Sequence, residues 1–214
     1  MRGTGFLAIW SDIERSDLTD YLHWLTREHT TERVTTQGFL ASRVFRAMRG
    51  DVARFFILYE LETPEVLDGP AYMARLNAPT PWSSRIMPKL GNFIRGGGVM
   101  AARAGKGEGC FVAALRIEHL PAVPQRLADR LAAQDGIAAV QIGATDAART
   151  SVPTREKGMR QQEGFFASLV IIEALDEAAL RAALRQATET APEMLAGEPE
   201  IYQSIFTLDA RIAA

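Results

Sequence analysis

Hydrophobic and polar positions along the chain repeat one order of strands and helices. Apolar or alternating runs rich in aromatic and β-branched residues predict strands, and apolar positions three and four residues apart predict helices. The first half has predicted strands at 6–12, 39–45, 54–61 and 93–101, helices at 16–34 and 63–76, and a short helix from 80 that Pro88 limits. The second half has predicted strands at 111–117, 137–142, 165–174 and 201–208, and helices at 123–133 and 177–190.

The shared order indicates an internal duplication. The stretch that begins at Tyr59 is similar to the one that begins at Ile172, and a Gly-Phe or Gly-Ile pair follows the first helix of each half. The flexible composition of 104–109 is typical of a linker. We therefore predict an N-terminal repeat over 1–106, which carries a candidate pocket, and a C-terminal repeat over 107–214.

Each predicted repeat has the βαββαβ order of a ferredoxin-like unit, an α+β arrangement of four antiparallel strands with both helices on one face. The other face of the sheet would be bare and apolar, and such a face is unstable in water. We therefore expect the two repeats to pack through their sheets as a pseudo-dimeric α/β barrel with its helices outside. The alternative is two ferredoxin-like domains side by side with an unrelated interface.

Composition narrows the functional classes. The chain of 214 residues is 47% hydrophobic and 23% charged, with a net charge of −2, so no basic field would attract nucleic acid. The single cysteine, Cys110, excludes an internal disulfide, and no apolar run approaches the ~20 residues that span a bilayer. These features predict a cytoplasmic protein with neither a nucleic-acid nor a membrane partner.

The first predicted helix places an imidazole on its buried side. At 100° per residue its apolar stripe faces the sheet and continues to His29, whereas His23 points to the opposite face; the stripe consists of Leu18, Tyr21, Leu22 and Leu25. The same count puts Glu32 on the inner side and Glu28 at its edge. His29 could be a general acid or base oriented by one of these carboxylates, or a core histidine bonded to a backbone carbonyl.

The second repeat serves as an internal control for His29. Its first helix has the aliphatic stripe Val123, Leu127 and Leu131 and carries no imidazole there. The scaffold therefore closes without a buried histidine, and the asymmetry favours a pocket in the first repeat.

Other residues of the first repeat are candidates for the same pocket. Arg43 shares a strand face with Phe39, Ala41 and Phe45, where it would either stabilise developing negative charge or pair with Glu60 or Glu32. We predict His29, Arg43 and Tyr59 as catalytic residues, and the following as substrate-binding: Trp10, Asp12, Glu28, Glu32 and Trp82.

Two segments carry ambiguous signals. The stretch 145–164 is polar and basic, which would suit a lid over a ligand but is more typical of an exposed mobile loop. The triplet Gly96-Gly97-Gly98 lies inside a predicted strand, and lacks the lysine and helix start of a phosphate loop. It therefore indicates a bulge or a close backbone approach. We find no metal-ligand spacing and no dinucleotide fingerprint, and we predict no metal and no cofactor.

The segment from Trp24 to Val34, followed by Gly38-Phe39 and Arg43, resembles a motif of the dimeric α/β barrel superfamily. In EthD-like and related uncharacterised members, a first helix ends in Glu-His-x-x-Glu-Arg before a Gly-Phe strand. The resemblance implies that His29 lies in a cavity between helices and sheet. Members include cofactor-free monooxygenases of aromatic polyketides, muconolactone-type isomerases, polyketide cyclases and tandem haem proteins. The second half lacks the motif.

These features predict a cofactor-independent enzyme, of lyase, isomerase or monooxygenase type. It would act on a hydrophobic or aromatic carbonyl-bearing small molecule through histidine acid/base chemistry. The alternatives are a haem-binding tandem barrel, for which His119 is the sole imidazole of the second half, and a non-catalytic small-molecule binding protein. Whether the chain forms a homodimer is left open.

Overall fold

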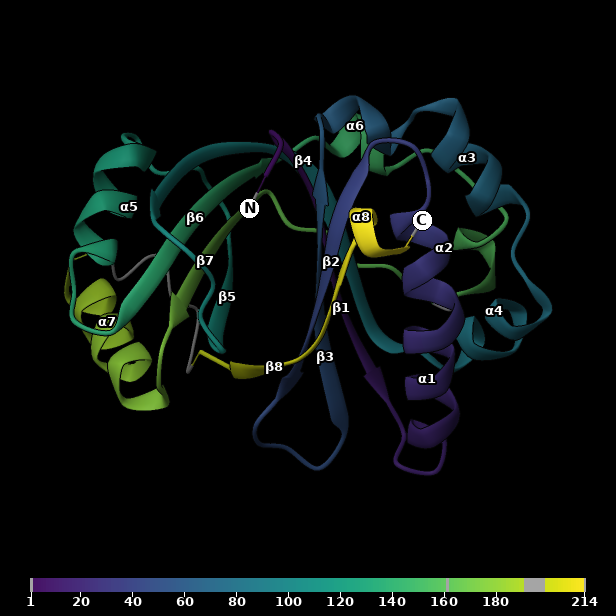
Figure 1. The fold of residues 1–214 in the computed structure, drawn as a ribbon, viewed down its shortest axis with the longest axis horizontal. Helices are drawn as coiled ribbons and strands as arrows, with labels where there is room; N and C mark the ends of the chain where they lie inside the picture. The colour runs from purple at the N-terminus through teal and green to yellow at the C-terminus, as the bar shows by residue number, and fades with distance from the viewer. Residues whose placement is uncertain (1, 161, 191–198, 214) are drawn as a thin grey trace.

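Eight antiparallel strands close into one barrel (Figure 1). The computed structural model describes residues 2–160, 162–190 and 199–213. The strands follow the order β1-β3-β2-β8-β5-β7-β6-β4 around the barrel. Their bounds are β1 Gly5–Ile13, β2 Phe39–Ala47, β3 Ala53–Leu61, β4 Gly91–Gly105, β5 Phe111–Ile117, β6 Ile137–Thr145, β7 Ser168–Ala174 and β8 Ile201–Asp209. All eight predicted strands are confirmed.

The longer helices lie outside the barrel, on opposite sides for the two halves (Figure 1). The first half has α1 Leu18–Trp24, a π-helical segment Leu25–His29, α2 Thr30–Val34, α3 Pro70–Asn77 and α4 Pro81–Ile86, with 3₁₀ turns at Pro64–Leu67 and Met87–Lys89. The second half has α5 Pro124–Ala132, α6 Ala147–Thr150, a 3₁₀ turn Lys157–Met159, α7 Glu177–Thr190 and α8 Ala210–Ala213. Within the described residues no helix has the length and apolarity needed to cross a bilayer.

The two halves are joined by strand pairing. The first half contributes β4-β1-β3-β2 and the second β8-β5-β7-β6, and the halves meet where β2 pairs with β8 and β4 with β6. The alternative of two separate domains is therefore wrong. The glycine triplet lies in β4, and a Cβ on Gly98 would come within 2.1 Å of the Ala144 carbonyl oxygen. The predicted close backbone approach is thus confirmed.

Apolar side chains form three clusters, one inside the barrel and one beneath the helices of each half. Alternation along the strands separates them, since Phe6, Ala8 and Trp10 of β1 point into the barrel while Leu7 and Ile9 face α1. Beneath the second-half helices the cluster is aliphatic, whereas its first-half counterpart is rich in aromatic rings. This aromatic layer contains the candidate site.

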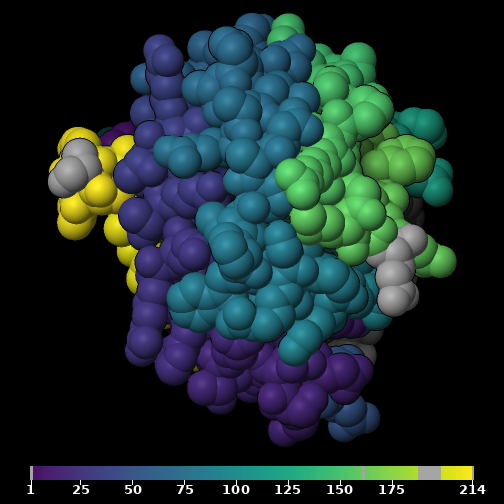
Figure 2. Space-filling view, turned by 90° about the vertical axis from the view of Figure 1, so that its right-hand side faces the viewer, coloured from purple at the N-terminus to yellow at the C-terminus, as the bar shows by residue number. Residues whose placement is uncertain are grey.

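The segment 145–164 packs against the first half, where Figure 2 shows it in green beside α3 and α4. The Glu156 backbone N–H donates to the Leu76 carbonyl at 3.0 Å, and the Gly164 N–H donates to the Phe93 carbonyl at 2.8 Å. The side chains of Glu156 and Arg160 are only 4% and 3% exposed. The expectation of an exposed loop is therefore wrong at Glu156 and Arg160, because Glu156 pairs with the buried Arg33 of the first half, whereas Ser151, Pro153 and Arg155 are exposed as expected.

Candidate functional site

A buried cavity lies between the first helix and the outer face of the first-half sheet. Its volume of about 20 Å³ has room for one or two water molecules. Three tyrosines, a serine, an imidazole and four charged groups line it together with apolar side chains. The polar lining residues are Ser11, Tyr21, His29, Arg33, Tyr59, Tyr72, Arg95, Glu156 and Arg160. The structure thus brings two of the three predicted catalytic residues, His29 and Tyr59, to one cavity.

A π-helical segment sets the direction of the side chains that follow it. The backbone N–H of Thr30 donates to the Leu25 carbonyl, five residues back, so the turn holds one residue more than an α-helix. Later side chains are thereby rotated by about 100°. For this reason Arg33, which is 2% exposed, takes the inward position that a regular helix would give to Glu32. Such segments occur frequently at functional sites.

His29 is buried and carries no charge near neutral pH. Its ring stacks on Trp24 with centroids 4.2 Å apart, and its Nδ1 has no hydrogen-bond partner within the part of the chain that the structure describes. Burial, followed by the nearby charge of Arg33, lowers the pKa of His29 well below its usual value. The predicted inward position of His29 is confirmed, and its neutral imidazole is available to accept a proton.

Neither predicted orienting carboxylate reaches the cavity lining. Glu28 accepts a hydrogen bond from the Thr80 hydroxyl at 2.6 Å, and Glu32 lies 3.4 Å from the Arg33 guanidinium. The carboxylate that does line the cavity is Glu156, from the second half. The expectation that Glu28 or Glu32 orients His29 therefore finds no support in the geometry.

Tyr59 supplies another of the unpartnered polar groups of the cavity, which also include the Tyr21 hydroxyl. It is fully buried, and its hydroxyl has no hydrogen-bond partner among the described residues. Burial raises the pKa of Tyr59 above its usual value, so the hydroxyl keeps its proton. A protonated phenol and a neutral imidazole in one buried cavity provide a proton donor and a proton acceptor.

A buried ion pair between the halves closes the cavity. Arg33 donates a hydrogen bond to Glu156, and the Arg160 guanidinium lies 3.1 Å from the same carboxylate. Burial alone would raise the pKa of Glu156, but the positive charges of Arg33 and Arg160 hold it at about 2. Sequence patterns missed this contact because Glu156 comes from a polar loop 123 residues away along the chain from Arg33.

Arg43 lies inside the barrel, on the other face of the sheet from His29. It donates to both carboxylate oxygens of Glu173, at 2.9 and 2.8 Å, and to the Gly109 carbonyl at 3.2 Å. A bulge in β2 explains why the expected shared face is wrong: the register shifts between Phe39 and Ala41, so Phe39 faces the helices. Arg43 is therefore separated from the predicted pocket by the sheet itself.

Three of the predicted substrate-binding residues also lie outside the cavity lining. Trp10 packs inside the barrel against Phe56, with ring centroids 4.8 Å apart. Asp12 accepts two hydrogen bonds from Arg54, at 2.6 and 2.8 Å. Trp82 donates from its indole nitrogen to Asp20 at 2.9 Å, at the edge of the aromatic layer. The structure does not bring these three residues to His29.

A larger cavity adjoins the small one, and Arg95 and Arg160 lie between the two. Arg95 and Arg160 line both the small cavity and a second one of about 470 Å³. The second cavity is bounded mainly by the segment 145–165 and is lined by Arg95, Thr145, Ala147, Thr150, Ser151, Lys157, Arg160, Gln162, Glu163, Gly164 and Phe165. It is open to solvent at the exposed ring of Phe165.

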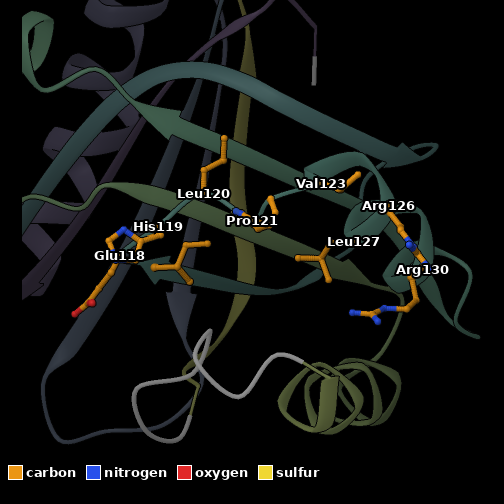
Figure 3. A pocket seen from close by; sticks show the side chains of 10 residues that line it. Glu118, His119, Leu120, Pro121, Val123, Arg126, Leu127 and Arg130 are labelled. Carbon is orange, nitrogen blue, oxygen red and sulfur yellow. The ribbon is translucent and has the colours of Figure 1, made fainter.

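A third cavity, of about 430 Å³, lies in the second half between α5 and the loop after β5 (Figure 3). His119 and Leu120 border it from the loop, and Arg126 and Arg130 from α5. The imidazole of His119 is exposed. This position does not fit an axial haem ligand, which is held within the buried environment that tunes the iron. The three cavities differ in kind, and only the small one encloses unpartnered acid and base groups.

A pH dependence of stability follows from the buried imidazole. Because the pKa of His29 is lowered in the folded protein, the unfolded chain binds the extra proton first. The stabilisation is complete above pH ~6.5 and falls by about 1.4 kcal/mol per pH unit as the pH drops below it. We expect urea denaturation between pH 7 and 5 to show this slope, and the slope to vanish in His29→Gln. The exposed His23 is the control: a His23→Gln variant that removed the slope would contradict this account.

Comparisons with known proteins concern the whole length of the chain. No protein-family model and no curated protein matches it. A "putative monooxygenase" from Fusobacterium nucleatum is 13% identical with a TM-score of 0.59, over 98% of this chain and 96% of its own. An anthrone oxidase-like protein is 14% identical with a TM-score of 0.57, over 98% and 94%. A "putative chlorite dismutase" is 10% identical with a TM-score of 0.51, over 98% and 97%. These likenesses show that the chain shares its overall fold with these solved structures.

Proposed function

We propose that this protein is an enzyme that modifies a hydrophobic or aromatic carbonyl-bearing small molecule without a resident cofactor. His29 would accept a proton and Tyr59 would donate a hydrogen bond to the oxygen that becomes negative. The observation that carries the proposal is the pair of unpartnered groups, His29 Nδ1 and the Tyr59 hydroxyl, in one buried cavity. Buried polar atoms are normally hydrogen-bonded, and exceptions call for an explanation such as catalysis.

His29 and Tyr59 together could remove a proton from a carbon next to a carbonyl group or from a phenol. The neutral imidazole would take the proton, and the nearby carboxylate of Glu156 would offset part of the cost that burial, Arg33 and Arg160 impose on the imidazolium. The developing oxyanion would be stabilised by the Tyr59 hydroxyl and by the Arg33 guanidinium. This step can begin an isomerisation, an elimination or an oxygenation. The names monooxygenase and anthrone oxidase-like among the structural neighbours support the proposal.

Substrate access requires the small cavity to enlarge. At about 20 Å³ it cannot hold an aromatic ring, whereas the adjoining cavity of about 470 Å³ can. Arg95 and Arg160 border both spaces, so movement of these side chains or of the segment 145–164 would join them. Active sites covered by a mobile segment commonly open in this way.

We also infer that the chain consists of two fused ferredoxin-like repeats. In support, the strand orders β4-β1-β3-β2 and β8-β5-β7-β6 are equivalent when the two halves are compared. The buried positions of α5 are Leu127, Ala128 and Leu131. The second repeat thus offers no counterpart to His29, and the proposed chemistry belongs to the first.

A second candidate is a binding protein without catalysis, which the open cavity of about 470 Å³ favours because it can hold a ligand away from His29. A ligand screen separates the two functions. Melting temperature is measured with a panel of aromatic acids, ketones and lactones, and each stabilising compound is then followed by mass spectrometry for conversion. Stabilisation without conversion of any compound would support the binding protein.

We expect His29→Gln to lower turnover of a converted compound by about 10²–10⁴-fold, because the proton acceptor is lost. Tyr59→Phe should lower kcat by roughly 10²-fold through the lost hydrogen bond to the oxyanion. His23→Gln, on the opposite face of the helix, is the matched control and should keep wild-type turnover. Circular dichroism verifies that each variant is folded. Full turnover in folded His29→Gln would refute the assignment.

A further inference from the structure

The second cavity, of about 470 Å³, carries an excess of positive charge. Among its lining residues Arg95, Lys157 and Arg160 are basic and Glu163 is acidic. Arg160 is paired with Glu156 and Glu163, at 3.1 and 2.5 Å. The Lys157 ammonium lies 3.8 Å from Glu163. A single carboxylate is thus shared by two cations, and Arg95 adds a third charge.

Arg95 has no carboxylate partner among the described residues. It is 4% exposed, and its guanidinium donates to the Thr150 carbonyl at 3.0 Å and to the Tyr72 hydroxyl at 3.4 Å. Both acceptors are neutral. A buried charge is costly unless it is paired. In addition, burial, together with the charges of Arg95 and Arg160, lowers the pKa of Lys157. The cavity therefore lacks one or more negative charges.

We infer that this cavity is a binding site for an aromatic carboxylate, with Arg95 and Lys157 holding its carboxylate group. A guanidinium presents paired N–H donors that match the two oxygens of a carboxylate. This site is separate from the proposed catalytic pair, and it holds its ligand whether or not His29 performs chemistry.

The apolar part of the cavity indicates that the anion is organic and aromatic. Phe165 is 82% exposed and forms part of the rim, beside Gly164 and near Ala147. An exposed ring of this size next to a basic cavity is a ready surface for a second ring to stack on. The volume of about 470 Å³ also exceeds what inorganic phosphate or chloride would fill.

The position of the site relates it to the small cavity. Arg95 and Arg160 contact both spaces, so a carboxylate bound here would lie on the boundary of the chamber that contains His29. A bound carboxylate would also compensate the positive charge of the segment 145–164, which covers the small cavity. The ligand could thus be a substrate that enters by this path or an effector that holds the segment closed.

Titration with 1-naphthoate tests the inference, measured by calorimetry on the full chain. We expect saturable binding at one site, at least tenfold tighter than binding of the isosteric neutral 1-naphthamide. Lys157→Gln should weaken naphthoate binding about tenfold, and Arg95→Gln should abolish it. Phe165→Ala should weaken it severalfold. Because Phe165 is exposed, that variant keeps the fold even if Arg95→Gln does not.

Controls separate this site from the others in the molecule. Arg126→Gln, in the cavity of the second half, should leave naphthoate binding unchanged, and so should His29→Gln. Equal affinity for the amide, absence of naphthoate binding, tighter binding of inorganic phosphate, or indifference to both Lys157→Gln and Phe165→Ala would each overturn the inference. Loss of turnover in His29→Gln with retained naphthoate binding would show that the two sites are distinct.

Discussion

Replacing Glu173 by glutamine is expected to lower the free energy of unfolding by about 3–5 kcal/mol, the cost of leaving one member of a buried ion pair alone. Glu173 is fully buried. It accepts two hydrogen bonds from Arg43, one from the Gly109 backbone at 3.0 Å and one from Gln141 at 2.9 Å. Glutamine would retain the shape but remove the buried charge that compensates Arg43, which would keep only the exposed carboxylate of Glu108, 3.3 Å away. Equilibrium denaturation in guanidinium chloride measures the loss.

A double-mutant cycle distinguishes the ion pair from a general defect. Arg43→Met combined with Glu173→Gln should destabilise the protein by less than the sum of the two single changes, because neither charge is then left unpaired. The half-buried pair of Glu177 with Arg181, 2.7 Å apart, is the control, and Glu177→Gln should cost below about 1 kcal/mol because water still reaches both groups. Additive losses in the cycle would contradict the assigned pairing.

The second large effect is expected for Glu156→Gln, which should release the segment 145–164 from the first half. The variant removes the carboxylate that Arg33 shares with Arg160 and leaves Arg33 only Glu32, 3.4 Å away, at a cost of about 3 kcal/mol. Amide hydrogen exchange should increase across this segment and the neighbouring turn at Leu76, while the barrel strands stay protected. The measurement is exchange followed by mass spectrometry on intact wild type and variant.

The same contact should open in acid. The pKa of Glu156 is held at about 2 in the folded protein against 4.5 ordinarily, so its stabilising effect is complete above pH ~4.5 and is lost as the pH falls towards 2. Glu163→Gln is the control, because Glu163 lies in the same segment with a more exposed side chain, and it should change exchange only slightly. Unchanged exchange in Glu156→Gln would show that other contacts hold the segment.

The order of strands and helices was predictable because each element carries its own local signal. Alternation in β1 and β3 and the apolar run of 168–174 fix their strands without reference to the rest of the chain. Barrel closure was predictable for a different reason, namely that each sheet would otherwise expose an apolar face. Both inferences depend on hydrophobic pattern alone.

The site was only partly predictable because three local irregularities change which side chains meet. The bulge at Phe39 and Ala41 puts Arg43 on the opposite face from Phe39. The π-helical segment directs Arg33 rather than Glu32 inward. Glu156 arrives from a loop whose polar composition gives no hint of burial. Hydrophobic periodicity assumes regular helices and strands. It therefore identified His29 and Tyr59, but it missed Arg33 and Glu156, which depend on an irregular helix and on a loop.

The circular order of the strands has a consequence for association with other chains. Because β2 pairs with β8 and β4 with β6, every described strand has a neighbour on both sides, and the unpaired stretch beside β8 is limited to 114–117 of β5. None of the eight described strands therefore offers its whole length as a template for another strand. A second copy of this chain would have to bind mainly through side chains or helices rather than by extending the sheet. Separating the two halves would expose four unpaired strand edges at once, and the covalent link between the halves opposes that separation.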